Sequence, residues 1–292
     1  MIISQLKGGL GNQLFQYAAG YAVAKKWQTD LKLDVLYLHN RSKRSEFFSY
    51  RNYALDYFNI SAPIASNKEI LSFTIPMTMN RKLHHFLCKL MFFGKVYPEK
   101  KYTIDEIPCH AYMIGYWQQP TIFSTYLPDL SREFSIKKDF ISSPTDIQKE
   151  ILRSENPVCI HFRRGDYVNL SSVGFITLDY YMNAIKILQN KIKNPTFFVF
   201  SDDIAWCKNN FIVPNIPTFY VDCISKNDLP TDYFHFNLMM NCHHFIIPNS
   251  TYSYWSALLG KHEQKIVIAP KKWHINQQEE QSNIIPANWI PI

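Results

Sequence analysis

The second half of the chain alternates short apolar runs with stretches of helical periodicity, and this alternation limits the fold more than any other feature. Strands that are apolar on both faces, each followed by a helix, are typical of a parallel sheet covered on both sides. The sequence therefore predicts an α/β fold with a doubly wound parallel sheet. The apolar runs lie at residues 158–162, 196–200, 218–221, 245–247 and 265–269, and the helical stretches lie at residues 179–189, 203–211, 230–242 and 251–259.

The first half is less regular but begins with the same pattern. Residues 1–6 form an apolar run, which is followed by a glycine cluster and then by a helical pattern. Residues 30–140 show no sustained period, and we expect an irregular α/β half there. Proline and small polar residues near 142–144 and 156–157 suggest a linker. We predict two domains, residues 1–155 and residues 156–292, with the final residues able to pack back on the first domain.

The bulk composition is that of a globular protein. The chain has 292 residues, 47% of them hydrophobic and 19% charged, and a formal net charge of +7, which argues against disorder. Its six cysteines include no C-x-x-C pair, so reduced thiols are expected rather than a zinc ribbon or a disulfide framework. The N-terminus lacks the pattern of a signal peptide, and no run of about eighteen apolar residues occurs. We expect a cytoplasmic protein.

Two adjacent arginines follow the first strong strand of the second half. In a parallel sheet, ligands bind at the carboxyl ends of the strands. Arg163 and Arg164 offer forked guanidinium donors that suit a pyrophosphate, and Gly165 lets the backbone turn closely around it. In the alternative interpretation, one arginine pairs with Asp166 and the other is solvated. The position after a buried strand favours phosphate binding.

Polar residues also follow two other predicted strands. Asp202 and Asp203 begin a helix, so at least one is expected to cap it, while the other remains a candidate for the N–H and amino groups of guanine. Asn249, Ser250 and Thr251 also precede a helix. Their hydroxyls and the first N–H groups of that helix can bind phosphate, or the hydroxyls can simply cap the helix; these two interpretations are compatible.

The N-terminal glycine cluster offers a turn near a ligand. Gly9 and Gly11 resemble a dinucleotide fingerprint only loosely, and no G-K-[ST] follows them as in a P-loop. The turn can bring the backbone close to a ligand, and Asn12 and Gln13 supply amide donors at the start of the helix. No carboxylate cluster with metal-ligand spacing occurs, and we therefore predict no metal site.

Five blocks of residues stand out along the chain, at residues 8–17, Gly115-Tyr116-Trp117-Gln118, residues 161–167, residues 200–203, and residues 249–252 with Trp255. Together they resemble the α-1,2-fucosyltransferases of glycosyltransferase family 11. The resemblance implies a GT-B-type fold with two Rossmann-like domains facing a cleft, of which the C-terminal one binds the donor. It also implies GDP-β-L-fucose as the donor, inversion at the sugar carbon, and no metal or other cofactor. The five blocks also run in the order found in this family.

The resemblance also implies roles for these residues. His161 and an acidic residue after the next strand would face guanine, while Arg163 and Arg164 would bind the pyrophosphate. For Asp166 two interpretations remain open: it acts as the general base that takes the acceptor proton, or it orients the arginines. The residues expected on the acceptor side of the cleft are Gly9, Gly11, Asn12, Gln13, Trp117 and Gln118.

The acceptor suggested by the family is a galactose-containing glycan, such as an O-antigen or another surface polysaccharide, whose 2-hydroxyl receives fucose. Residues 81–93 mix basic and bulky apolar side chains. They are candidates either for contact with the inner face of a membrane carrying a lipid-linked glycan, or for a core helix. The chain lacks an RNP-type motif and an arginine-rich arm, so nucleic acid is not expected as a partner. The alternatives are a non-catalytic GDP-sugar-binding module and a fucosyltransferase of different linkage.

Overall fold

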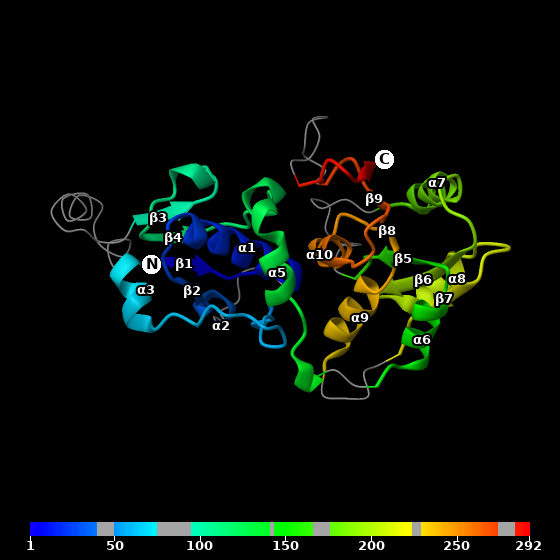
Figure 1. Cartoon of the computed structure of the whole chain (residues 1–292), viewed down its shortest axis with the longest axis horizontal. Helices are drawn as coiled ribbons and strands as arrows, with labels where there is room; N and C mark the ends of the chain where they lie inside the picture. The colour runs from blue at the N-terminus through cyan, green and yellow to red at the C-terminus, as the bar shows by residue number, and fades with distance from the viewer. Residues whose placement is uncertain (40–49, 75–94, 141–142, 166–175, 224–228, 274–283) are drawn as a thin grey trace. The chain divides into compact units, whose positions relative to one another are not determined.

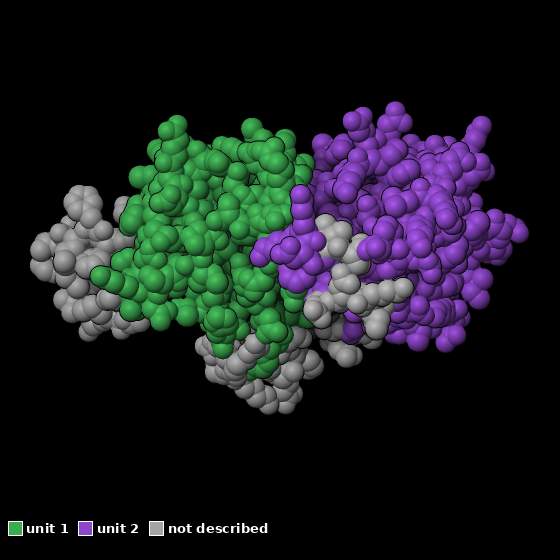
Figure 2. Space-filling model, turned by 60° about the horizontal axis from the view of Figure 1, so that its bottom comes forward, with its two compact units in different colours: residues 1–135 green, residues 136–292 purple. Residues whose placement is uncertain are grey.

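The chain folds into two compact units, Met1–Ser135 and Ile136–Ile292, which Figure 2 shows in different colours. The computed structural model describes residues 1–39, 50–74, 95–140, 143–165, 176–223, 229–273 and 284–292. The domain boundary predicted after residue 155 lies at the start of a strand. Residues 136–155, which include helix α6 (Asp146–Arg153), group instead with the second unit.

The first unit is built on a four-stranded sheet in which every pair of neighbouring strands is parallel. The predicted N-terminal strand is a central strand of this sheet. The predicted irregular half contributes the other three strands. In spatial order the strands are β2 (Leu31–Asp34), β1 (Ile2–Gln5), β4 (Ala111–Ile114) and β3 (Lys95–Pro98).

Helix α1 (Leu10–Lys26) packs against this sheet over most of its length (Figure 1). Gly20 makes the close approach possible, because a Cβ atom there would lie 2.8 Å from Leu31 Cδ1 and 3.1 Å from Ser4 Cβ. An apolar cluster joins Ile3 of β1 to Phe73 of helix α3 (Asn67–Thr74). The shorter helices of the unit are α2 (Leu36–His39), α3 (Asn67–Thr74) and α5 (Leu127–Glu133).

The second unit carries a six-stranded sheet, also with every neighbouring pair parallel. All five apolar runs of the second half form strands of this sheet, which confirms the predicted doubly wound class. In spatial order the strands are β10 (Ile290–Pro291), β9 (Val267–Ala269), β8 (His244–Ile246), β5 (Asn156–Phe162), β6 (Pro195–Ser201) and β7 (Thr218–Tyr220).

Helices cover both faces of this sheet, as the continuous apolar strands require. Val158, Ile160 and Phe162 of β5 pack in one cluster with side chains of α7 and α8. The alternate residue His161 instead contacts the ring of Tyr252 on α10. Figure 1 shows α7 and α8 on one side of the sheet and α9 and α10 on the other. These helices are α7 (Leu178–Gln189), α8 (Ile204–Asn210), α9 (Thr231–Met240) and α10 (Thr251–Leu259).

The last residues of the chain close one edge of the second sheet. Ile290 and Ile292 pack against its core, and the Ile292 N–H donates to Ala269 O at 3.0 Å. None of the helices in the described part of the chain has the length and apolar character needed to cross a bilayer. Residues 81–93, for which we predicted either a membrane contact or a core helix, lie outside the described residues.

His244, at the start of β8, is buried in its neutral form. Its Nδ1 accepts the Ile266 N–H at 3.1 Å, so the ring proton lies on Nε2, which is 3.3 Å from Asn156 Oδ1. Burial, followed by the nearby His262 and His243, lowers the pKa of His244 to about 4. Protonation of Nδ1 would break the bond to Ile266 and charge a ring that is only 3% exposed.

We predict that this histidine makes the protein sensitive to acid. Because the folded-state pKa is depressed, the stabilisation is complete above about pH 6.5 and is lost as the pH falls towards 4. Between pH 7.5 and 5.0, His244 alone should lower the free energy of unfolding by about 2 kcal/mol. His244→Asn keeps a side-chain acceptor for the Ile266 N–H but removes the titrating ring. Between pH 7.5 and 5.0, its free energy of unfolding, measured with urea, should therefore fall by about 2 kcal/mol less than that of the unsubstituted protein.

The exposed His39 provides the matched control. His39→Asn should retain the pH dependence of the unsubstituted protein. An equal pH dependence in the His244→Asn protein would show that another group carries the acid sensitivity.

Candidate functional site

The two arginines and the two aspartates predicted to bind a ligand meet at one edge of the second sheet. Strands β5 and β6 pair in parallel, with Phe162 opposite Ser201. Their carboxyl ends therefore coincide. Arg163 and Arg164 directly follow one strand, and residues 202–203 directly follow the other.

Asp202 holds both arginines in place. Its Oδ2 pairs with Arg163 Nη1 at 2.8 Å, and its Oδ1 accepts the backbone N–H of Arg164, also at 2.8 Å. Gly165 makes room for this carboxylate, because a Cβ at that position would lie 2.6 Å from Asp202 Oδ2. We predicted that this glycine lets the backbone come close to a pyrophosphate. In the structure it lets the backbone come close to Asp202, the aspartate that orients the arginines.

Arg164 is fixed by a carboxylate and an aromatic ring. Its Nε donates to Asp203 Oδ2 at 3.3 Å, and its guanidinium carbon lies 3.5 Å from the ring centre of Trp206. Asp203 Oδ1 accepts the Trp206 N–H at 3.2 Å, which confirms the predicted helix cap. Trp206 was not among the predicted site residues. Its spacing of three residues from the cap was the available signal, since that spacing places it in the first turn of α8.

His161 lies beside these charges but carries none. It is 5% exposed, and Tyr181 Oη donates to its backbone oxygen at 2.9 Å. Burial, followed by the charges of Arg163 and His235, lowers its pKa to about 3. Among the described residues its Nδ1 has no hydrogen-bond partner. A neutral imidazole with an unsatisfied nitrogen can form a hydrogen bond with a ligand without adding charge.

The start of α10 adjoins the same edge, because β8 pairs with β5 on the side away from β6. Asn249 Nδ2 donates to Trp273 O at 3.1 Å, and Thr251 begins the helix. Ser250 occupies the N-cap position, yet within the described residues its side chain makes no capping hydrogen bond. The interpretation as an N-cap is therefore confirmed for the position of Ser250 but not for its hydroxyl group. The first N–H groups of α10 are not satisfied by this serine.

The two aspartates are engaged with the arginines, so the predicted contact of one of them with guanine stays a prediction. Asp166, the proposed base, lies outside the described residues. Within the described residues, no three His, Cys, Asp or Glu side chains are grouped so that they could hold a metal ion.

In the first unit, the N-terminal glycine cluster forms the tight entry into α1. Gly8 has a φ of +77°, and a Cβ there would lie 2.6 Å from Asn12 Nδ2. Gly9 precedes the helix, and a Cβ built on it meets nothing within 4 Å. Gly11 is buried in the first turn. The predicted glycine turn is therefore present and is open at Gly9.

Gln13 does not serve the ligand role expected for it. Its side chain is fully buried. Its Nε2 donates to Gly8 O and Asn52 O, both at 2.9 Å, and its Oε1 accepts the Ala54 N–H at 2.9 Å. The amide clamps the glycine turn to residues 52–54, because this position of α1 points into the unit. The prediction for Gln13 was wrong because the motif alone does not specify the direction in which the side chain points.

Asn12 joins the two motifs of the first unit. Gln118 Nε2 donates to Asn12 Oδ1 at 2.9 Å. Trp117 is 2% exposed and has a φ of +51°. Gln16, inside the first motif, donates from Nε2 to Gly115 O at 3.0 Å. The predicted acceptor-side residues thus meet at the carboxyl ends of β1 and β4, with Asn12 and Gln118 only partly buried.

The model of glycosyl transferase family 11 matches residues 1–292. Among curated proteins, an alpha-1,2-colitosyltransferase of Escherichia coli is 32% identical over 303 residues, which cover 100% of this chain and 99% of the relative. The O-antigen biosynthesis glycosyltransferase WbnK of Escherichia coli is also 32% identical, with 98% and 99% covered. The galactoside 2-alpha-L-fucosyltransferase Sec1 of Mus musculus is 24% identical, with 89% of this chain and 64% of the relative covered.

Solved structures show a similar fold. Fucosyltransferase NodZ from Bradyrhizobium superposes with a TM-score of 0.51 at 13% identity, covering 88% of this chain and 92% of that one. At this identity the likeness concerns the fold alone. It confirms the predicted α/β class of GT-B type with parallel sheets.

The buried amide of Gln13 predicts a structural rather than a ligand-binding phenotype. Gln13→Ala removes three hydrogen bonds and leaves the Ala54 N–H buried, so it should lower the free energy of unfolding by about 3 kcal/mol. Urea unfolding measures this loss. Asn12→Ala, the neighbouring and partly exposed amide, should cost about 1 kcal/mol or less. Equal stability of the Gln13→Ala protein and the unsubstituted protein would refute the clamp.

Proposed function

Because the chain belongs to glycosyltransferase family 11, we propose that it transfers L-fucose from GDP-β-L-fucose to the 2-hydroxyl of a terminal β-galactoside. The observation that supports this proposal most directly is the pair of guanidinium groups that Asp202 and Asp203 fix at the adjacent carboxyl ends of β5 and β6. Their position at a strand-end crevice next to a helix start suits a diphosphate.

The donor diphosphate is the natural ligand of this edge. Arg163 and Arg164 bring two positive charges, and their guanidinium groups are already oriented by carboxylates and by the ring of Trp206. Such preorganised cations stabilise charge that develops on a leaving group without reorganising during the reaction. On this proposal the arginines take the role that a divalent cation has in other nucleotide-sugar transferases, and no metal is required.

The proposed reaction is a single displacement. The acceptor 2-hydroxyl oxygen attacks the anomeric carbon, the bond from that carbon to the β-phosphate oxygen breaks, and GDP departs with the electron pair. The configuration inverts, and the hydroxyl proton passes to a general base. Asp166 remains our candidate for this base on the strength of the motif. The neutral His161 would contribute hydrogen bonds to the guanine base without repelling the arginines.

The relatives favour a bacterial surface glycan as the acceptor, since one of them is named for O-antigen biosynthesis. They also favour a second donor candidate. A relative at 32% identity is named alpha-1,2-colitosyltransferase, and colitose is fucose without its 3-hydroxyl. The names of the colitosyltransferase and of the fucosyltransferase relative both give a linkage to position 2 of the acceptor. The two donor candidates therefore differ only in whether the sugar has a 3-hydroxyl group that the donor site must accommodate.

The deciding experiment is transfer from labelled donor to an array of β-galactosides. We expect transfer from GDP-fucose to a terminal β-galactose, with equal rates in EDTA and in magnesium. GDP-colitose, offered alone and in competition, measures the donor preference. Binding of GDP-sugar without transfer to any glycan would instead identify a non-catalytic GDP-sugar-binding module. Methylation analysis of the product would identify a linkage other than 1,2.

Replacing the forked donor by a point charge should disable the proposed donor site. Arg163→Lys should lower kcat by about a hundredfold, because an ammonium group cannot reproduce a bidentate guanidinium contact. Steady-state kinetics with GDP-fucose and the best array acceptor measure this effect.

Arg153→Lys is the matched control, since Arg153 is exposed at the end of α6. Its turnover should equal that of the unsubstituted enzyme. Turnover within twofold of normal in the Arg163→Lys enzyme would remove Arg163 from the donor site.

A further inference from the structure

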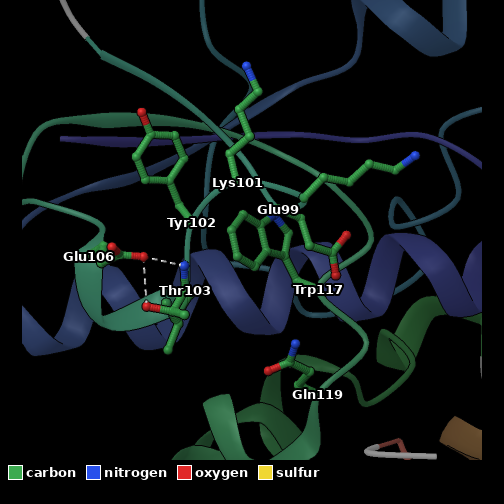
Figure 3. A pocket seen from close by; sticks show the side chains of 9 residues that line it. Glu99, Lys101, Tyr102, Thr103, Glu106, Trp117 and Gln119 are labelled. Carbon is green, nitrogen blue, oxygen red and sulfur yellow. Dashed lines mark hydrogen bonds between the residues drawn. The ribbon is translucent and has the colours of Figure 1, made fainter.

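A pocket of about 330 Å³ lies within the first unit, between the segment that follows β3 and the segment that follows β4. Its volume falls at the lower end of the range of about 300 to 1000 Å³ that is typical of small-molecule sites. In Figure 3 the indole of Trp117 stands between Glu99 and the Thr103–Glu106 pair, with Gln119 nearby. Most of the side chains that line the pocket can form hydrogen bonds.

One corner of the pocket offers an acceptor beside a donor. Glu99 Oε2 accepts the Tyr116 N–H at 2.6 Å. A Cβ atom built on Gly115 would lie 2.7 Å from that same oxygen and 3.0 Å from Trp117 Nε1. The same Cβ atom would lie only 2.4 Å from Glu99 Cβ, so the absence of a side chain at Gly115 lets the Glu99 carboxylate lie close to the indole N–H of Trp117.

The indole donor is unsatisfied. Trp117 is 2% exposed, and among the described residues its Nε1 has no hydrogen-bond partner. A buried donor without a partner is costly, as is a bulky residue in the left-handed region of φ. Strained backbone of this kind clusters at active sites and ligand clamps.

The opposite wall is held by hydrogen bonds and by a contact between aromatic rings. Glu106 Oε2 accepts from the Thr103 N–H at 2.7 Å and from Thr103 Oγ1 at 3.0 Å, which closes a capping box. Tyr102 contributes a ring that is 38% exposed and is held edge-on against Tyr97, with the ring centres 4.9 Å apart. A partly exposed aromatic ring beside fixed polar groups offers an apolar face as well as hydrogen bonds.

We propose that this pocket binds one neutral hexopyranose ring of the acceptor glycan. A sugar ring presents hydroxyls that both donate and accept and carries a face of C–H groups, which matches a carboxylate, an indole N–H, an amide and a tyrosine ring. Glu99 and Glu106 disfavour an anionic ligand, although Lys100 and Lys101 also line the pocket. The inference rests on the proposed glycosyl transfer for the identity of the ligand, but the pocket binds the sugar without the donor.

Two substitutions each remove one of the corner groups. Glu99→Gln keeps an oxygen for the Tyr116 N–H but removes the charge, and Trp117→Phe keeps an aromatic ring but removes the N–H. Saturation-transfer NMR and calorimetry with lactose and N-acetyllactosamine, on the full chain without donor, should show affinity lowered about tenfold by each. The KM for the saccharide should rise as its affinity falls, while the affinity for GDP should stay within twofold of that of the unsubstituted protein.

The matched controls lie outside the pocket. Trp27→Phe also removes an indole N–H, which donates to Ile107 O at 2.9 Å, and Glu263→Gln neutralises an exposed carboxylate. Both should bind the saccharides as the unsubstituted protein does. Thermal unfolding of all four variants shows which are folded, and Glu99→Gln carries the test if Trp117→Phe does not fold.

The outcomes separate this inference from the proposed function. Saccharide binding that is lost in the pocket variants, in a protein that transfers no fucose, would support the pocket and refute the fucosyl transfer. Normal transfer with an unchanged saccharide KM in both variants would refute the pocket and leave the transfer standing. Binding of inorganic phosphate in place of the saccharides, strengthened in Glu99→Gln because a repelling charge is removed, would overturn the assignment to a neutral sugar.

Discussion

The site depends on the pairing of two arginines and two aspartates across the ends of β5 and β6. The parallel register places the residues that follow these two strands side by side. The charged side chains therefore meet directly at the strand ends. Arg164 has a side chain only 15% exposed, and a guanidinium so placed would be costly without compensation. Asp203 and the ring of Trp206 provide that compensation and also fix its orientation. Asp202 does the same for Arg163. The arginines are therefore oriented before any ligand arrives.

The first unit also places its motifs at the carboxyl ends of parallel strands, but with side chains of a different kind. Each motif uses a glycine where a side chain would displace a polar group: Gly8 beside Asn12, and Gly115 beside Glu99. The edge of the second sheet holds two oriented guanidinium groups that suit a diphosphate, whereas the pocket of the first unit mixes two carboxylates and two lysines with neutral hydrogen-bonding groups. This contrast is the physical basis for our proposals of a nucleotide-sugar donor in one unit and a saccharide acceptor in the other.

The sequence predicted most of the second sheet because strands buried on both faces must be apolar throughout, which makes each one visible as a run. The same rule placed Arg163 and Asp202 at one edge. It failed where side-chain direction decides the role: Gln13 lies in a ligand-like motif but points inward to clamp residues 52–54. Glu99 was missed because a single carboxylate has no distinctive spacing, and Trp206 was missed because its spacing from the helix cap does not show that its ring covers a guanidinium group. The short strands of the first unit gave no sustained period either.

The central claim is that the arginine pair binds a diphosphate without a metal ion, and calorimetric titration of the full chain with GDP and with GMP, both in EDTA, tests it most directly. The two nucleotides share the guanine base and differ by the β-phosphate that the arginines would bind. The account predicts that GDP binds about a hundredfold more tightly than GMP, since bidentate charge-assisted hydrogen bonds to the second phosphate would be lost. Equal affinities for GDP and GMP would contradict it.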